Sequence, residues 1–241
     1  MTATTSVLLL MLEKVARALG PDLCQKMTFV GGCTTGLLLT DEYTKEQVRY
    51  TDDVDLIVHA MGYLGFHSLQ KELQDHGFSI GIPESGETQP ICAMRLGNLR
   101  VDFMPEDEDV LGFTNKWYKA AMQTATPYSL TREVTIRLIT PVYFLATKLE
   151  AFKGRGNDDV LGSRDIEDIL QLLDGRAELV GEVQSAESGV LNFIAIELSA
   201  LLEDRHFEYA VASQTKGNVG RENLIFERLE TLTAAVRGVI G

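Results

Sequence analysis

Positive charge is scarce in this sequence. Its 241 residues include 22 lysines and arginines against 35 aspartates and glutamates, so the formal net charge is −13. Both halves of the chain share the acidic excess. Such a charge argues against unspecific binding to nucleic acid, because a phosphate backbone requires a positively charged surface. A local basic groove remains compatible with it, and an acidic surface would attract a cationic substrate or a basic partner protein.

Cysteines and long hydrophobic runs are also sparse. The three cysteines, Cys24, Cys33 and Cys92, have neither zinc-ligand nor redox-motif spacing, so we expect reduced thiols rather than a metal finger or a disulfide scaffold. The apolar run at residues 7–12 is too short to span a membrane and has no basic residue ahead of it. We therefore expect a soluble, cytoplasmic protein with no membrane partner.

The order of the expected elements indicates an α/β (α+β) fold with two domains. Strand-like segments occur up to about residue 140, and only helix-like segments follow. We predict a mixed-sheet domain over residues 1–140 and an all-helical domain over residues 141–241. The helices expected in the second domain cover residues 141–153, 163–174, 176–184, 187–204 and 221–239, with a flexible connector at 154–162.

In the first domain, apolar residues at helical spacing predict a helix over residues 4–19 that ends at Gly20-Pro21. A second helix, over residues 62–76, is expected to turn Leu64, Leu69 and Leu73 inward. The other expected elements are a short helix at 33–39, a polar loop at 40–50, a strand at 78–82, a loop at 83–89, a helix at 113–123 and a strand at 133–139.

Two carboxylates follow a glycine turn in the stretch between residues 27 and 59. Asp53 and Asp55 open an apolar strand, and because alternate strand residues point the same way, both carboxylates share one face. Two carboxylates at so short a distance repel each other unless a positive charge lies between them. A hard divalent cation, which prefers oxygen ligands, would supply that charge. Upstream, Gly31-Gly32 permits a close backbone approach, and backbone N–H groups at a helix start hold phosphate well. This combination favours phosphoryl or nucleotidyl transfer.

A third carboxylate lies in a predicted hairpin. Residues 91–104 form two strand candidates joined by Gly97-Asn98, which is a hairpin signal. Asp102 stands between two apolar residues of the second strand, and burying a carboxylate without a partner is expensive. If this strand lies beside the strand of Asp53 and Asp55, the three carboxylates converge.

These motifs, with two more, resemble a known family. They are the Gly31-Gly32 turn before a short helix and the segments 49–56 (RYTDDVDL), 101–103 (VDF), 148–151 (KLEA) and 164–168 (RDIED). In this combination the chain resembles the DNA polymerase beta-type nucleotidyltransferase superfamily, and most closely its AbiEii/MenT group of toxin nucleotidyltransferases. The resemblance covers about residues 25–175. The interval between Gly32 and Asp53 is a few residues longer than is usual in the family, which makes residues 40–50 an insertion.

The resemblance implies metal-dependent transfer of a nucleoside monophosphate from a nucleoside triphosphate (NTP) to an acceptor hydroxyl. It implies that Asp53 and Asp55 bind two Mg²⁺ ions, and that Asp102 holds one of them and helps to activate the acceptor. Two such ions about 3.5–4 Å apart can stabilise both the attacking and the leaving oxygen. Lys148 would neutralise phosphate charge from the helical domain. The other implied binding residues are Gly31, Gly32, Thr34 or Thr35 for the triphosphate, and Arg49, Thr51, Arg164, Asp165 and Asp168 around the site.

The candidates at the centre of the site also have purely structural alternatives. Asp102 could form an ion pair with Arg100 or with Arg95. Gly31-Gly32 could do no more than end a strand. Lys148 could extend out of the core into solvent.

The remaining candidates have alternatives of the same kind. Asp165 and Asp168 lie three residues apart on one helix face, where they could orient Lys148 or Arg164, or be ordinary surface acids. Arg49 and Thr51 could simply support their loop.

Three functions remain open at this stage. The first is a toxin-like enzyme of a toxin–antitoxin pair that adds nucleotides to RNA, at the 3′ end of tRNA, with an antitoxin as its neutralising partner. The basic residues that could face RNA are Lys148, Lys153, Arg155 and Arg164. The second is nucleotide transfer to a small cationic molecule such as an aminoglycoside, which suits the acidic composition better. The third is a non-catalytic module that binds nucleotide or a partner protein.

Overall fold

The computed structural model of the chain describes residues 3–81, 90–112, 114–155 and 159–240. The chain divides into two compact units, one formed by Met1–Thr34 and Arg49–Thr140 and the other by Thr35–Val48 and Pro141–Gly241. One boundary lies at residue 140, where two domains were predicted to meet, although their independence as domains stays a prediction. Within the described ranges, no helix combines the length and apolarity that crossing a membrane requires.

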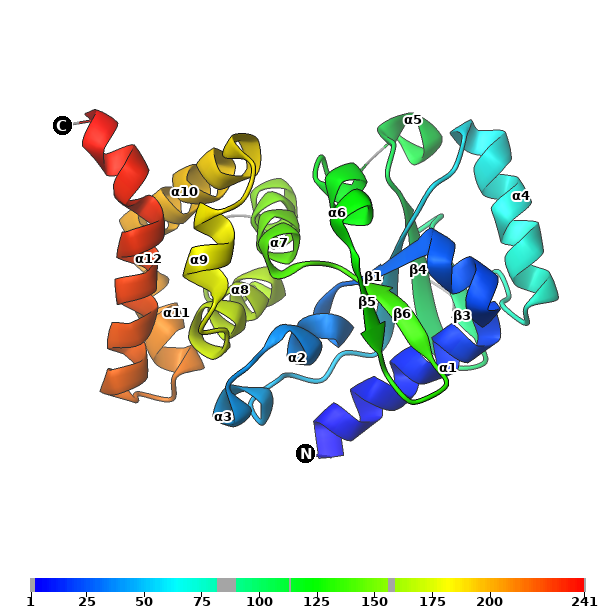
Figure 1. Cartoon of the computed structure of the whole chain (residues 1–241), viewed down its shortest axis with the longest axis horizontal. Helices are drawn as coiled ribbons and strands as arrows, with labels where there is room; N and C mark the ends of the chain where they lie inside the picture. Colours follow the sequence, from blue (N-terminus) through cyan, green and yellow to red (C-terminus); the bar gives the residue numbers. More distant parts are fainter. Residues whose placement is uncertain (1–2, 82–89, 113, 156–158, 241) are drawn as a thin grey trace. The chain divides into compact units, whose positions relative to one another are not determined.

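The first unit is built on a mixed sheet of six strands (Figure 1). The strands are β1 (Met27–Val30), β2 (Asp53–Val58), β3 (Ala93–Leu96), β4 (Leu99–Pro105), β5 (Thr126–Ser129) and β6 (Thr135–Leu138). They lie in the order β3-β4-β2-β1-β6-β5. Strand β2 pairs antiparallel with β1 and parallel with β4, while β6 pairs parallel with β1. The sheet and its accompanying helices confirm the predicted α/β fold class.

The central strands are buried because their apolar side chains lie on both faces. Leu56 and Ile57 are adjacent in β2 and therefore point to opposite faces, and both are completely inaccessible to solvent, as is Phe29 of β1. The helical segment α1 (Ala3–Lys26) consists of two helices, and the first ends at Gly20-Pro21, as was predicted. The chain bends at Gly20, whose φ of 73° and ψ of 171° are not helical, and Pro21 then begins a second helical stretch. Proline is tolerated there because the first helical position needs no N–H.

The predicted hairpin forms, and it places Asp102 in β4. Its turn contains Gly97 with a φ of 64°, a conformation that glycine adopts without strain. The strand predicted at 78–82 is reduced, among described residues, to a single bridge between Ser79 and Arg95, and the loop predicted at 83–89 lies outside the described residues. Strand β5 was not predicted because Pro127 is unusual in a strand. As an edge strand, β5 tolerates that proline.

In the first unit, the position of the helix predicted at residues 62–76 agrees with the structure better than its predicted buried face does. Helix α4 (Gly62–Asp75) matches the prediction, but Leu64 is 79% exposed rather than inward. Leu73 is buried as predicted, and Phe66, seven residues earlier, is the other buried residue of this face. Around them lie the short turn η1 (Gly32–Thr34) and the helices α5 (Glu108–Leu111) and α6 (Tyr118–Thr124).

Helices make up the second unit (Figure 1, α7 to α12 in green to red, α2 and α3 in blue). They are α7 (Pro141–Arg155), α8 (Arg164–Gly175), α9 (Leu179–Gln184), α10 (Ser188–Glu203), α11 (Phe207–Gln214) and α12 (Val219–Ile240), joined by α2 (Thr35–Leu38) and α3 (Glu42–Lys45). Helix α11 was not predicted, and no side chain caps its N-terminus, so the usual start signal is missing. The connector predicted at 154–162 contains three residues outside the described ranges.

The insertion at residues 40–50 is not the loop that was predicted, since it contains α3 and is bonded to the second unit. Asp41 caps α3 by accepting from Thr44 N at 2.8 Å. Arg221 of α12 binds Asp41 at 2.8 Å and Asp174 of α8 at 2.8 Å. The backbone N–H groups of residues 40 and 41 both donate to Gly175 O, at 2.8 and 2.9 Å. An arginine that joins both segments therefore makes residues 35–48 an integral part of the helical unit.

Candidate metal centre

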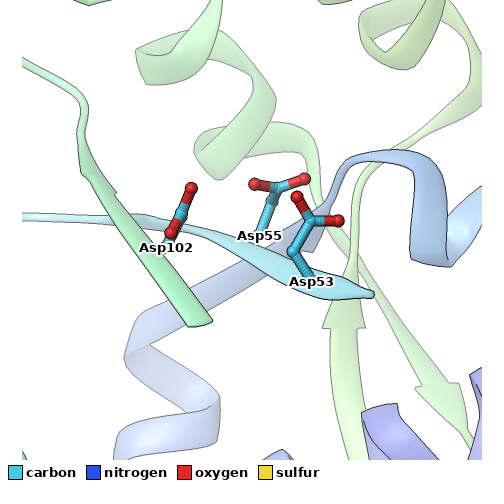
Figure 2. Close-up of side chains that lie close together, drawn as sticks. All are labelled: Asp53, Asp55 and Asp102. Carbon is cyan, nitrogen blue, oxygen red and sulfur yellow. The ribbon is translucent and has the colours of Figure 1, made fainter. Parts of the chain in front are cut away.

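The strand register brings the three predicted carboxylates together in the first unit. Parallel pairing sets Asp55 of β2 opposite Asp102 of β4, and Asp53 lies two residues before Asp55 on the same face. Figure 2 shows all three side chains pointing to the same side of the two strands. One carboxylate oxygen from each residue lies within 4.8 Å of the others. The predicted convergence is confirmed, because β2 and β4 are neighbours in the sheet.

The donor set of this triad fits a hard divalent cation. It offers only oxygen atoms, which Mg²⁺ and Ca²⁺ prefer, and no nitrogen or sulfur ligand. Asp102 is buried, whereas Asp53 and Asp55 are partly exposed, so substrate oxygens or water could complete the coordination. Three carboxylates this close repel one another unless positive charge lies among them. The arrangement can therefore hold a metal ion.

Gly31 lies directly against the triad. Its φ of 76° belongs to the left-handed region, and a Cβ built on it would overlap the Asp55 carboxylate, 2.7 Å from Cγ and 2.8 Å from Cβ. The neighbouring Val30 pairs with Asp55 across β1 and β2, which explains the proximity. Glycine is thus required here both by conformation and by space. The turn does more than end a strand, although its predicted contact with phosphate stays a prediction.

The residues that flank the turn and the triad have structural partners. Thr34 is buried, and its hydroxyl donates to Gly31 O at 2.8 Å, which closes the turn. The Thr51 hydroxyl donates to Asp53, one of the triad carboxylates. Arg49 belongs to the same unit, just before Thr51. Their predicted roles in nucleotide binding stay predictions, and Thr51 at least orients a carboxylate of the triad.

Arg100, which the sequence suggested only as a possible ion-pair partner of Asp102, is a close neighbour of the triad. Arg100 donates from Nε to Asp102 Oδ1 at 2.8 Å and from Nη2 to Asp102 Oδ2 at 2.6 Å. These hydrogen bonds raise the pKa of the Arg100 guanidinium above its ordinary value, against the opposing effect of burial. Of the two candidates Arg100 and Arg95, Arg100 forms the ion pair. Asp102 is thus both a triad member and the partner of a cation.

Two buried thiols also lie within the electrostatic reach of the triad. Burial, followed by the charges of Asp55 and Asp53, raises the pKa of Cys33 far above its ordinary value. Burial and the charge of Asp102 raise the pKa of Cys92 to about 12. Both thiols therefore stay protonated and neutral, so they add no further negative charge. Sequence spacing had not connected Cys92 with the triad, since its proximity depends on the hairpin.

A second cluster of charges lies in the helical unit. Lys148 of α7 contacts Asp165 Oδ1 at 3.1 Å and Asp168 Oδ2 at 2.6 Å, and Asp168 also accepts from Thr35 Oγ1 at 3.3 Å. The Lys148 side chain is only 10% exposed, so it does not extend into solvent. Burial would raise the pKa of Asp165, but the charges of Lys148 and Arg155 and their hydrogen bonds outweigh it and lower the pKa. The two acids orient Lys148, as one alternative proposed.

The basic residues proposed to face RNA are mostly engaged with carboxylates. Lys153 pairs with Glu197 at 2.5 Å, and Arg155 pairs with Asp165 at 3.2 Å. Arg164 begins α8 and is exposed. The structure therefore gathers Asp53, Asp55 and Asp102 in one unit, and Lys148, Asp165, Asp168 and Thr35 in the other. A joint role for the two clusters stays a prediction.

Comparison with known proteins finds distant structural likeness only. No protein-family model matches the chain, and no curated protein matches it. Among solved structures, the chain is similar to an antigenic nucleotidyltransferase-like protein from Paracoccidioides brasiliensis, with 21% identity and a TM-score of 0.46. The match covers 89% of this chain and 92% of that chain. A likeness this distant does not establish a function, which must follow from the geometry of the residues.

Proposed function

We propose that this protein is a metal-dependent nucleotidyltransferase that moves a nucleoside monophosphate from an NTP to an acceptor hydroxyl. The observation that supports it is the convergence of Asp53, Asp55 and Asp102, whose ligand oxygens lie within 4.8 Å of one another. Gly31 adds a second feature, because it brings a turn against the Asp55 carboxylate. Carboxylates beside a backbone turn are the parts that binding of a metal–triphosphate requires.

In this proposal the triad binds two Mg²⁺ ions. Bound there, the ions would neutralise triphosphate charge and stabilise the attacking and leaving oxygens. The acceptor oxygen forms a bond to the α-phosphorus, the bond from that phosphorus to the bridging oxygen breaks, and pyrophosphate leaves with the electron pair. Asp102 would help to take the proton of the acceptor hydroxyl. Asp53 and Asp55 would hold the reacting groups in position.

The remaining candidates would bind the triphosphate. Backbone N–H groups of the turn at Gly31 and Gly32 would donate to phosphate oxygens, with the hydroxyl of Thr34 or Thr35 as a further contact. Lys148, oriented by its two aspartates, would neutralise phosphate charge. Positioning and charge neutralisation supply most of the catalysis in this class of reaction.

The acceptor that we propose first is RNA, at the 3′ end of tRNA, in a toxin role with a neutralising antitoxin. This proposal is supported by the resemblance of the motifs and not by the acidic composition of the chain. A small cationic acceptor such as an aminoglycoside is the second candidate. It is favoured by the net charge of −13 and by the pairing of Lys153 and Arg155 with carboxylates, which weakens the basic patch that RNA would need.

One assay separates these possibilities. The protein is incubated with Mg²⁺, each of the four α-³²P-labelled NTPs in turn, and either total tRNA or a panel of aminoglycosides. We expect label in one acceptor, together with released pyrophosphate, and a loss of at least about 100-fold in Asp53→Asn. Asp52→Asn is the matched control, because Asp52 is the exposed neighbour and not a member of the triad. Equal transfer by Asp53→Asn and wild type would contradict the proposal.

A non-catalytic binding module is the remaining alternative. It predicts NTP binding without label transfer to any acceptor, and a biological effect that survives Asp53→Ala. A growth assay of cells that express wild type, Asp53→Ala or Asp52→Ala tests it directly. Under our proposal only Asp53→Ala abolishes the effect, whereas a binding module would leave all three proteins equally active.

A further inference from the structure

Arg100 belongs to the same face of the sheet as the three carboxylates. Parallel pairing sets Arg100 of β4 opposite Asp53 of β2, as it sets Asp102 opposite Asp55. Arg100 and Asp102 are two residues apart in one strand, so their side chains point to the same side. The strand register therefore places the guanidinium within the carboxylate site. The four side chains form two pairs, each with one member on β2 and the other on β4.

The guanidinium occupies both oxygens of one proposed metal ligand. Nε and Nη2 of Arg100 bind Oδ1 and Oδ2 of Asp102 at 2.8 and 2.6 Å, the two-pronged geometry in which arginine binds carboxylate most strongly. A divalent cation needs oxygens of that same carboxylate. Guanidinium and metal thus compete for Asp102.

The two partners differ in their freedom to move. The Asp102 side chain is 10% exposed and is held in the middle of the sheet, whereas the Arg100 side chain is 40% exposed at its long, flexible end. Exchange at this site would therefore move the arginine and leave the carboxylate in place. A guanidinium released there would find a new partner in a phosphate group, whose geometry its fork also matches.

We propose that Arg100 is a built-in counter-cation that couples metal binding to NTP binding. This inference rests on the proposed function. In the metal-free protein, Arg100 neutralises part of the triad and keeps the carboxylates together. A bare divalent cation must displace it, which weakens binding. A cation that arrives with a triphosphate provides a new anionic partner for Arg100, so the NTP strengthens metal binding.

The test measures metal affinity in the presence and absence of nucleotide. Calorimetric titration with Mn²⁺ is performed on wild type, Arg100→Gln and Arg95→Gln, with and without a non-hydrolysable NTP. Arg95 is the matched control, since it lies opposite Arg100 across the hairpin and changes the net charge equally, but forms no ion pair with a described residue. A thermal melt of each protein checks that it is folded.

The expected pattern is specific to Arg100. Arg100→Gln should bind Mn²⁺ about tenfold more tightly than wild type without nucleotide, and the strengthening by NTP should shrink by a similar factor. Arg95→Gln should change both quantities by less than about twofold, because Arg95 holds no carboxylate of the triad in an ion pair. Arg100→Lys, which keeps the charge but loses the fork, should lie between wild type and Arg100→Gln.

The outcomes separate this inference from the proposed function. Unchanged or weaker Mn²⁺ binding in Arg100→Gln, or an equal effect in Arg95→Gln, would overturn the counter-cation role while wild-type metal binding still supported the triad. Absence of Mn²⁺ binding to every variant, with and without nucleotide, would instead contradict the proposed function.

Discussion

Gly31→Ala tests the close approach between the glycine turn and the triad. An added Cβ would overlap the Asp55 carboxylate and lie 2.7 Å from its Cγ, and the φ of 76° already disfavours any side chain. The left-handed backbone alone costs an alanine about 1–2 kcal/mol. Inserting a methyl group into an occupied position typically costs a further ~1–3 kcal/mol. The variant should therefore lose about 2–5 kcal/mol of unfolding free energy, and Asp55 should be displaced.

Gly77→Ala is the matched control for backbone strain. Gly77 belongs to the same unit and has a φ of 87°, but no described atom lies within 4 Å of a Cβ built there. It should lose only the conformational cost of about 1–2 kcal/mol. The difference between the two variants isolates the contact with Asp55.

Two measurements complete this test. Urea denaturation, followed by circular dichroism, gives the unfolding free energy of each variant. Calorimetric Mn²⁺ titration at a temperature where each protein is folded gives the affinity of the triad. With Asp55 displaced, Gly31→Ala should bind Mn²⁺ at least about tenfold more weakly, and Gly77→Ala should match wild type. Equal stability losses and equal affinities in the two variants would refute the reasoning.

Three further predictions concern the helical unit. Because the pKa of Asp165 is lowered on folding, its charge stabilises the protein above about pH 3.9, and this contribution disappears as the pH falls below that value. Thermal melts at pH 5 and pH 3 should therefore show a larger loss in wild type than in Asp165→Asn; an equal loss contradicts the assignment. Lys148→Met should cost roughly 3–5 kcal/mol in urea denaturation because it removes the lysine partner of the fully buried Asp168, and adding Asp168→Asn should recover part of it. No recovery in the double variant would show that the pairing does not govern the cost. Arg221→Met should cost about 3 kcal/mol by the same measurement, against at most ~1 kcal/mol for Lys153→Met at an exposed lysine, and equal costs would contradict a structural role of Arg221.

The convergence of the carboxylates could be predicted from sequence because it depends on local alternation and one pairing. Asp53 and Asp55 share a face in any strand, and the hairpin signal at Gly97-Asn98 places Asp102 in a strand of its own. The one assumption was that these two strands are adjacent in the sheet. The structure supplies it, since β2 and β4 pair in parallel.

The contacts that the sequence could not reveal depend on long-range packing. Arg221 binds Asp174, 47 positions away, and Asp41, 180 positions away, and neither bond could be read from the polar composition of residues 40–50, which was compatible with a loop. Leu64 has the same hydrophobicity as Leu73, yet Leu73 is fully buried and Leu64 is 79% exposed. Periodicity identified the helix, but the identity of its buried face depended on neighbours that no local pattern encodes.

Arg100 is an intermediate case. It was named in advance only as one of two possible ion-pair partners of Asp102, and the structure shows that it lies on the same face of β4. From the sequence, an ion pair and metal ligation were considered as alternative roles of Asp102. The structure shows an ion pair inside a cluster that could also hold a metal, because β2 brings two further carboxylates to the same place.

The central claim can be tested by crystallography of the full chain with Mn²⁺ and a non-hydrolysable NTP. The proposed function predicts an anomalous Mn²⁺ peak at coordination distance from carboxylate oxygens of Asp53, Asp55 and Asp102, with phosphate oxygens completing the shell. Anomalous density elsewhere in a crystal with bound nucleotide, or none at the triad at saturating Mn²⁺, would contradict it.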